Sequence, residues 1–487
     1  MPGSISFNTI PAALRLPGVY IEFDNSLAGN AAIAFKVLVV GQRLAIGTVQ
    51  EGVPTRVNSD AQAEEYFGRG SMLAEMLKKA KAVDPFMDTW AIALDDDVAG
   101  AAATGTITIT GAATGSGALT LYIAGTKVPV AVTTGDDATA VATAVAAAIT
   151  ADTTLPVTAI SALGVVTVTA RHKGETGNDI DLRMNYYGEK TPAGIAVAFV
   201  AMAAGATNPD MATVVAGMGP EWYNWIVSPF TDATNMLALE AELDARWGPM
   251  QQIGGRAFTA FRGSHAAAIT HGDGRNNPHV TCMGTNTAPQ PPYIWAAVNA
   301  MVAAGKLAND PARPLQTLKL PGIMAPAIEL RWTDAERNLL LFDGISTYTV
   351  GSDGAIYIER QITMYQENGA GLPDDSYLDI NTPETLERIR FEIRALFGLK
   401  YPRHKLAEDD ARIGAGQPVM QPKLAKAELL ALYRTQEEKG WVQDYEGYKA
   451  ALIILINAGN PTRLDIQDSP KLVGQLRTIA AQTQFRR

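Results

Sequence analysis

An abrupt change of composition at Asp95-Asp96-Asp97 is the feature that most constrains how this 487-residue chain folds. From about residue 100 to residue 205 the sequence is rich in Ala, Thr, Val and Gly and carries both alternating and helical apolar patterns. On either side, apolar runs typical of buried strands alternate with helical patterns. Because both a strand-like and a helix-like apolar pattern are present, an inserted folded domain is favoured over a low-complexity linker. We therefore expect an α/β domain that is interrupted by a second folded unit.

The interrupting stretch has predicted strands at residues 106–110, 119–123 and 128–132. Between the last two strands, Ala124-Gly125-Thr126 predicts a hairpin turn. Asp136 is the predicted N-cap of an Ala-rich helix that extends to residue 149, and two more strands are expected around Gly164. The inserted domain should therefore be β-rich with one helix.

The flanking sequence predicts helices and strands in alternation. Before the insertion, buried strands are expected at residues 31–40 and 87–94, with helix starts at Ser59, which has Gln62 three residues later, and at Ser71. The later predicted strands are residues 223–227, 256–261, 346–350, 355–363 and 452–456. The later predicted helices are residues 232–247, 293–307, 333–342, 422–439 and a long helix after Thr382-Pro383 that extends to residue 397.

Charge and cysteine content exclude several classes of protein. The chain has 40 basic and 50 acidic residues, a net charge of −10, and no run of Lys or Arg, so we expect no direct contact with nucleic acid. The single cysteine, Cys282, cannot form an internal disulfide, which suits a reducing cytoplasm. The N-terminus lacks the pattern of a secretion signal, and the apolar stretch at residues 450–456 is too short to cross a bilayer.

A metal-dependent hydrolase is the alternative from a different functional class. Its candidate site is a set of residues comprising His265, His271, Asp273, His279 and Cys282. The spacing fits neither two histidines on one helical turn nor a paired-cysteine zinc site, so we expect ordinary polar residues. The three adjacent aspartates lack the spaced ligands of a calcium loop and predict a solvated turn.

Sites for nucleotides and nucleophilic catalysis are not predicted either. Gly305-Lys306 is followed by Leu307 and does not form a phosphate-binding loop, and Ser116 and Ser346 do not lie in a nucleophile elbow. We therefore expect no catalytic residue, no metal site and no cofactor.

Short motifs in a fixed order resemble the tail sheath proteins of Mu-like contractile phages. The resemblance starts at Gly18-Val19-Tyr20 and ends at Gln484-Phe485-Arg486. The motifs between these ends are NWIVSPF at 224–230, GGRAFTAFRG at 254–263, DPARPLQ at 310–316, ERN at 336–338, GIST at 344–347, IER at 358–360, SYLDI at 376–380 and YPRHKL at 401–406. Each motif alone is weak, but their order over nearly the whole length of the chain carries the resemblance, and the insertion at about 97–204 is its weakest part.

This resemblance implies a structural protein, not an enzyme. Subunits would form six-membered rings stacked helically around a tail tube, and the cylinder would contract to drive the tube through the host envelope. The implied partners are other copies of the chain, the tail tube protein, and the baseplate and tail terminator proteins, without membrane insertion. The protein would be assembled in the host bacterial cytoplasm and reside in the virion. The sheath of a phage-derived injection device is the closely related alternative.

The predicted fold is multidomain and α/β, in the sense of mixed α+β. Its expected parts are an extended N-terminal arm at residues 1–30, an α/β core at 31–96 and 205–374, an outer inserted domain at 97–204, an inner C-terminal domain at 375–457 and a C-terminal arm at 458–487.

Both arms are candidate contacts between subunits. In a strand, Val19, Ile21 and Phe23 would share one face, because side chains alternate. The candidate residues of the C-terminal arm are Leu476, Ile479 and Phe485. The sequence pattern of the arms fits two alternatives: each arm could pair as a strand within its own subunit, or it could add a strand to the sheet of a neighbouring subunit. The resemblance favours exchange between subunits.

Overall fold

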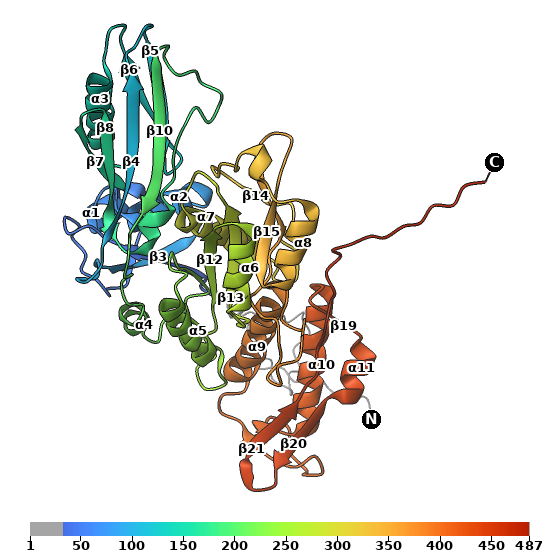
Figure 1. The fold of residues 1–487 in the computed structure, drawn as a ribbon. Helices are drawn as coiled ribbons and strands as arrows, with labels where there is room; N and C mark the ends of the chain where they lie inside the picture. The colour runs from blue at the N-terminus through green and yellow to red at the C-terminus, as the bar shows by residue number, and fades with distance from the viewer. Residues whose placement is uncertain (1–32, 487) are drawn as a thin grey trace, which may run out of the picture. The chain divides into compact units, whose positions relative to one another are not determined.

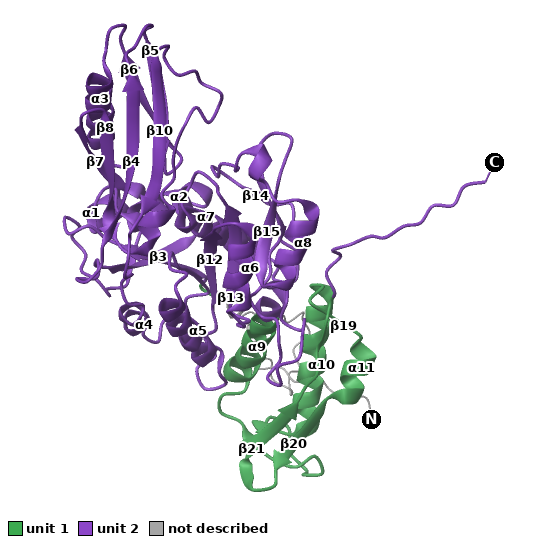
Figure 2. Ribbon diagram, viewed as in Figure 1, with its two compact units in different colours: residues 1–34, 386–473 green, residues 35–385, 474–487 purple. Residues whose placement is uncertain are grey.

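The structure, a computed structural model, describes residues 33–486. The chain forms two compact units (Figure 2). The larger unit contains residues 35–385 and 474–486, and the smaller unit contains residues 386–473 together with residues 33–34. The predicted fold class, mixed α/β with several domains, is confirmed by the helices and sheets of these units.

A nine-stranded sheet forms the centre of the larger unit, in the order β14-β16-β15-β13-β12-β11-β1-β3-β2. Its strands are β1 (Lys36–Gln42), β2 (Thr55–Arg56), β3 (Asp88–Leu94), β11 (Trp225–Val227), β12 (Arg256–Arg262), β13 (Val280–Asn286), β14 (Lys319–Leu320), β15 (Ile345–Val350) and β16 (Ile356–Arg360). The strands from β3 to β15 in this order pair in parallel, and the outer ones pair antiparallel. All seven residues of β13 are buried, as is typical of a parallel strand covered on both faces.

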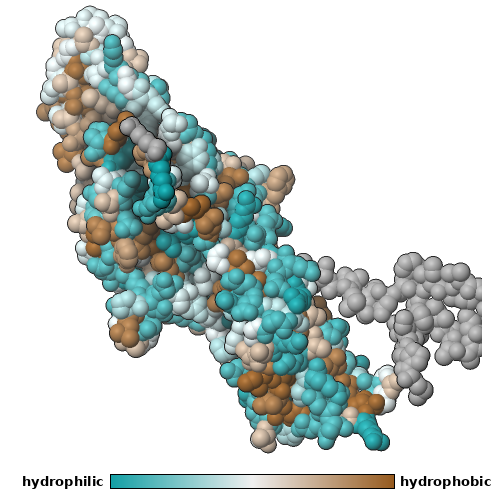
Figure 3. All heavy atoms as spheres, turned by 90° about the vertical axis from the view of Figure 1, so that its right-hand side faces the viewer, coloured by the Kyte–Doolittle hydropathy of each residue, from teal (hydrophilic) through white to brown (hydrophobic). Residues whose placement is uncertain are grey.

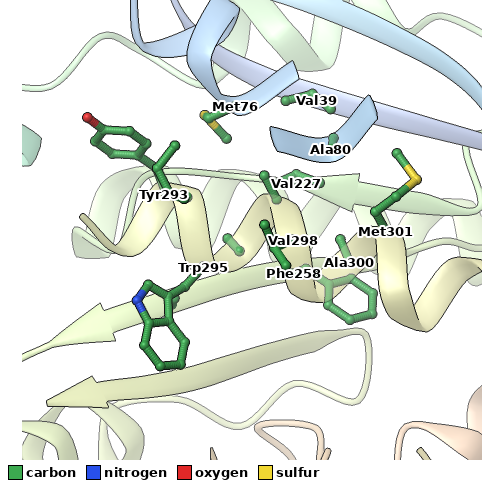
Figure 4. Close-up of a cluster of buried hydrophobic side chains, with 14 of the residues drawn as sticks. Val39, Met76, Ala80, Val227, Phe258, Tyr293, Trp295, Val298, Ala300 and Met301 are labelled. Carbon is green, nitrogen blue, oxygen red and sulfur yellow. The ribbon is translucent and has the colours of Figure 1, made fainter. Parts of the chain in front are cut away.

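Helices cover both faces of this sheet, and alternating residues of β1 show how. Val37 and Val39 belong to the core cluster that includes α2 (Met72–Val83) and α7 (Pro292–Leu307), whereas Leu38 and Val40 belong to the cluster on the other face. Figure 4 shows Val39 and Met76 opposite the side chains of α7. The other helices of the sheet domain are α1 (Asp60–Phe67), α4 (Ala212–Met218), α5 (Ala233–Trp247), α6 (His265–Asp273) and α8 (Asp334–Phe342).

The inserted stretch between β3 and α4 forms two antiparallel sheets with a hydrophobic core of their own. Its elements are β4 (Ala102–Gly111), β5 (Gly117–Ile123), β6 (Thr126–Val132), α3 (Ala138–Ala151), β7 (Val157–Ala162), β8 (Val165–Lys173), η1 (Glu175–Asp179), β9 (Leu182–Met184) and β10 (Ile195–Ala203). The sheet orders are β10-β4-β8-β7 and β6-β5-β9. Figure 1 shows α3 beside β7 and β8, which it contacts.

A partly buried polar network joins this insertion to the α/β sheet. Asp96 accepts hydrogen bonds from Gln42 Nε2 at 2.8 Å, from the ring Nδ1 of His172 at 2.9 Å and from the backbone N–H of Lys173 at 3.0 Å. The other ring nitrogen of His172 accepts the N–H of Met72 at 3.1 Å. Burial favours a higher pKa for Asp96, but these donors outweigh it and hold the pKa below its usual value. The prediction of a solvated turn at the aspartates is therefore wrong for Asp96.

Apart from residues 33–34, the smaller unit begins within α9 (Asn381–Lys400), whose first five residues belong to the larger unit. Its other elements are β17 (Lys405–Leu406), β18 (Val419–Met420), α10 (Pro422–Glu438), β19 (Val442–Gln443), α11 (Tyr445–Ala451), β20 (Ile453–Asn457), β21 (Asn460–Gln467) and β22 (Lys471–Leu472). Tyr433 of α10 stacks on Tyr448 of α11 with ring centroids 3.8 Å apart. The predicted domain boundaries stay a prediction.

Most predicted helices and strands are present, and the prediction differs from the structure mainly in where these elements begin and end. The cap of α3 is Asp137, which accepts the N–H of Ala140, and not Asp136. The hairpin turn between β5 and β6 has two residues, Ala124 and Gly125, both at positive φ, because Ile123 already pairs with Thr126. The helix α9 begins at Asn381, one residue before the predicted cap Thr382. The predicted cap Ser59 is confirmed, and so is the predicted helix start near Ser71, whose side chain caps α2.

Candidate assembly surface

The last residues of the chain, 474–486, here called the C-terminal tail, carry three of the predicted contact residues. Leu476 is 68% exposed, Ile479 79% and Phe485 85%. The tail contains no helix or strand and no backbone–backbone hydrogen bond within residues 474–486. The structure therefore presents these apolar side chains to solvent instead of packing them in their own subunit. The other predicted contact residues, Val19, Ile21 and Phe23, lie outside the described residues.

A second apolar surface lies on the hairpin formed by β20 and β21. Ile453 and Leu455 of β20, which lie on the same face of the hairpin, are 48% and 61% exposed. Ile454 points the other way, because side chains alternate along a strand, and is buried on the side where β20 contacts α10. Figure 3 shows apolar side chains gathered on this part of the smaller unit, at the bottom of the view.

This hairpin also has unpaired edges. It is a separate two-stranded sheet, so each strand pairs with a neighbour on one side only within the described residues. Exposed apolar side chains beside an open edge are unusual on a monomeric protein, and short two-stranded sheets are marginally stable without a partner. The sequence predicted this strand, but the hairpin was not among the candidate contacts between subunits. The signal was the unbroken apolar run at residues 452–456, which is longer than one buried face requires.

The histidines of the candidate metal site have other partners. His265 lies on α6, with its Nε2 2.9 Å from the carbonyl oxygen of Glu336. His271 stacks on Phe261 with centroids 4.5 Å apart, and burial, with a smaller effect of Arg275, lowers its pKa to about 4. These histidines are therefore held in packing and hydrogen-bonding roles.

Of the remaining three candidates, Asp273 is exposed at the end of α6, whereas His279 and Cys282 are buried in the sheet domain. His279 is 3% exposed, and its Nδ1 lies 3.2 Å from Nη1 of Arg256. Cys282 is fully buried in β13, and burial raises the pKa of its thiol to about 12, so the reactive thiolate is disfavoured. Within residues 33–486, no three His, Cys, Asp or Glu side chains are grouped so that they could hold a metal ion. No helix of this described range is sufficiently long and apolar to span a membrane.

Comparisons with known proteins identify the family. Residues 204–364 match the model of the phage tail sheath protein central domain, and residues 373–486 match that of the phage tail sheath C-terminal domain. The Mu-like prophage FluMu tail sheath protein of Haemophilus influenzae is 46% identical over 485 residues, which cover 99% of each chain. This confirms the resemblance to Mu-like sheath proteins.

Solved structures give weaker similarities. A sheath tail protein from Desulfitobacterium hafniense is 14% identical, covers 94% of this chain and 97% of its own, and has a TM-score of 0.49. The corresponding values for sheath tail protein from Listeria innocua are 11%, 91%, 93% and 0.48. Both TM-scores are below 0.5, so the assignment rests on the sequence relative and the two domain models. The chain therefore belongs to the phage tail sheath family and is a structural protein of a contractile tail.

Proposed function

We propose that this sheath protein polymerises into stacked six-membered rings around a tail tube, and that the cylinder shortens to drive the tube through the host envelope. The observation that carries the proposal is the full-length identity of 46% to a Mu-like tail sheath protein. The proposed partners are further copies of the chain, the tail tube protein, and the baseplate and tail terminator proteins. Assembly takes place in the host bacterial cytoplasm, and the mature protein resides in the virion tail. A phage-derived injection device would use the same polymer.

The proposed contacts between subunits are exchanged arms. The C-terminal tail carries the exposed side chains of Ile479 and Phe485 and has no sheet partner of its own within the described residues. The hairpin β20–β21 has open edges and the exposed side chains of Ile453 and Leu455. An added strand from a neighbouring subunit would pair its backbone with an open edge and place apolar side chains beside those of the hairpin. The N-terminal arm, with Val19, Ile21 and Phe23, would add a second strand.

The work of contraction would come from the polymer itself. An extended polymer that is metastable can release free energy stored in its interfaces when the first ring is disturbed. The sequence contains no phosphate-binding loop that could couple contraction to a nucleotide. The role proposed for the protein is therefore mechanical and not catalytic.

The insertion is proposed to lie on the outside of the cylinder. It has its own hydrophobic core, and its two ends meet in a bridge between Ala101 and Ala206. A folded unit whose ends meet can be added to a surface without disturbing the domain that carries it.

Electron microscopy of the purified full-length protein tests this function. Hollow, striated cylinders are the expected result, with shortened and widened forms after a destabilising treatment. A compact monomer at every concentration, or a monomer with a tightly bound metal ion and hydrolytic activity, would contradict the proposal and favour the hydrolase alternative.

A further inference from the structure

The base of the C-terminal tail is held by one carboxylate that binds two guanidinium groups. Asp379 forms a bidentate ion pair with Arg360, with both N–O distances at 3.0 Å, and accepts a third hydrogen bond from Nη2 of Arg477 at 2.9 Å. The side chains of Arg477 and Asp379 are 13% and 18% exposed. The tail therefore begins as a fixed part of the larger unit and not as a free end.

Further hydrogen bonds hold the same point of the tail. Arg477 Nη1 donates to Oε1 of Gln316 at 3.2 Å, and Gln316 in turn lies 3.5 Å from the carbonyl oxygen of Leu476. Gln475 donates to the carbonyl oxygen of Ala312 at 3.3 Å and accepts a hydrogen bond from Arg477. Arg477 is the last residue of the tail that is held in this way. Residues 478–486 are exposed and make no hydrogen bond within the described residues.

The cluster of Arg360, Asp379 and Arg477 joins two segments of the chain that lie on either side of the smaller unit in the sequence. The chain passes from the larger to the smaller unit after Thr385 and returns after Val473 (Figure 2). Asp379 lies shortly before the first crossing, and Arg477 lies shortly after the second. Two segments that are far apart in sequence are thus joined where the tail leaves the folded unit.

The charges explain why Asp379 is the central member. Arg360 and Arg477 both approach it, so without the carboxylate two guanidinium groups would face each other in a partly buried place. Burial lowers the pKa of Arg477 and Asp379 opposes this effect, but the guanidinium stays charged, so without the carboxylate two partly buried positive charges would be left uncompensated. Removal of one partner from a partly buried pair costs more than removal from an exposed one, because the other charge is left without compensation.

We propose that Asp379 is a positioning residue that anchors the C-terminal tail through Arg477 and so fixes the point and direction from which the tail reaches a neighbouring subunit. The claim that the tail is directed toward a neighbouring subunit rests on the proposed arm exchange. The claim that Asp379 anchors the tail does not, and it can be tested on the monomer alone. Anchoring reduces the conformational freedom that the tail loses when it binds, which strengthens binding without any new contact.

A spin label beside the anchor tests the proposal on the full chain. Thr478 is exposed and Cys282 is fully buried, so Thr478→Cys can be labelled selectively with a nitroxide. Arg477→Gln and Asp379→Asn should each increase the mobility of the label. The matched control is Arg56→Gln, which removes an exposed Arg–Asp pair between β2 and β3 and should leave the mobility unchanged.

Two further variants separate an anchor from a general loss of structure. The double variant Asp379→Asn with Arg477→Gln should be no more mobile than the more mobile single variant, because both changes break the same link. Arg360→Gln combined with Asp379→Asn should restore part of the order, because it removes the repulsion between the two guanidinium groups. Circular dichroism should give the same folded spectrum for all variants. Unchanged mobility in folded Asp379→Asn and Arg477→Gln would overturn the proposal.

Assembly of the same proteins tests the proposed function separately. If the tail is exchanged, Arg477→Gln should raise the critical concentration for cylinder formation roughly fivefold, the factor expected for a pair of modest strength. An increase in mobility without any change in assembly would support the anchor and contradict exchange of the C-terminal arm. An unchanged mobility with weakened assembly would overturn the anchor and leave exchange intact.

Discussion

Leu455 on the open hairpin gives the sharpest prediction about the proposed interface. Its side chain is 61% exposed in the subunit, so most of its apolar surface is still available for burial in a polymer. Full burial of a leucine side chain stabilises by about 2 kcal/mol, and the exposed fraction corresponds to about 1 kcal/mol for each subunit added. Leu455→Ala should therefore raise the critical concentration for assembly roughly fivefold. The stability of the monomer should change little, because few of these contacts exist before assembly.

Sedimentation and light scattering over a concentration series measure this effect, and thermal unfolding of the monomer gives the stability. Leu163→Ala is the matched control, because Leu163 is 91% exposed and lies at the turn between β7 and β8 of the insertion, which we place outside the contacts. The control should assemble like the unchanged chain. An unchanged critical concentration for Leu455→Ala, or an equal effect of both substitutions, would refute the role of the hairpin as acceptor.

Three more predictions address the arms, the insertion and His271. Ile21→Pro, or removal of residues 1–25, should give a folded, soluble monomer that forms no cylinders in sedimentation, because proline removes a backbone donor from a shared strand; an unfolded monomer would mean that the strand belongs to its own core. Replacement of residues 102–205 by a Gly-Gly link should leave cylinders visible by electron microscopy, since Ala101 and Ala206 are already hydrogen-bonded; a folded variant that never assembles would contradict an outer position. His271 has its pKa lowered to about 4, so the unfolded chain binds a proton that the native chain excludes, and stability should fall by up to about 3 kcal/mol as the pH drops from about 6.5 to about 4. Denaturant unfolding of His271→Gln should show a flatter pH dependence over this range, and an unchanged dependence would exclude this histidine as its cause.

Local signals in the sequence predicted much of the fold. Ser59, Ser71 and Asp232 cap helices because a short polar side chain can accept the N–H of the residue three positions later. The alternation in β4 and β6 was visible because one face of each strand is buried in the core of the insertion. Such features depend on neighbours within a few residues, which is why sequence patterns suffice to find them.

Contacts between distant segments could not be predicted in this way. No pattern near Asp379 indicates that it binds Arg477, 98 positions later, because the pair depends on the path of the chain through the smaller unit. The apolar run of β20 was visible in the sequence, but such a run has the same appearance whether its second face is buried or exposed. Asp96 likewise forms a hydrogen bond with His172, 76 positions later in the insertion. The exposed face of the hairpin could therefore be found only in the structure, whereas the tail residues and the family could be predicted from the sequence.

Cryo-electron microscopy of assembled cylinders, at a resolution that traces each chain, tests the central claim most directly. The account predicts that residues 479–486 of one subunit form a strand on an open edge of the hairpin β20–β21 of a different subunit, with Ile479 and Phe485 beside Leu455 or Ile453. A tail that pairs with its own hairpin, or that stays unpaired on the surface of the cylinder, would contradict it.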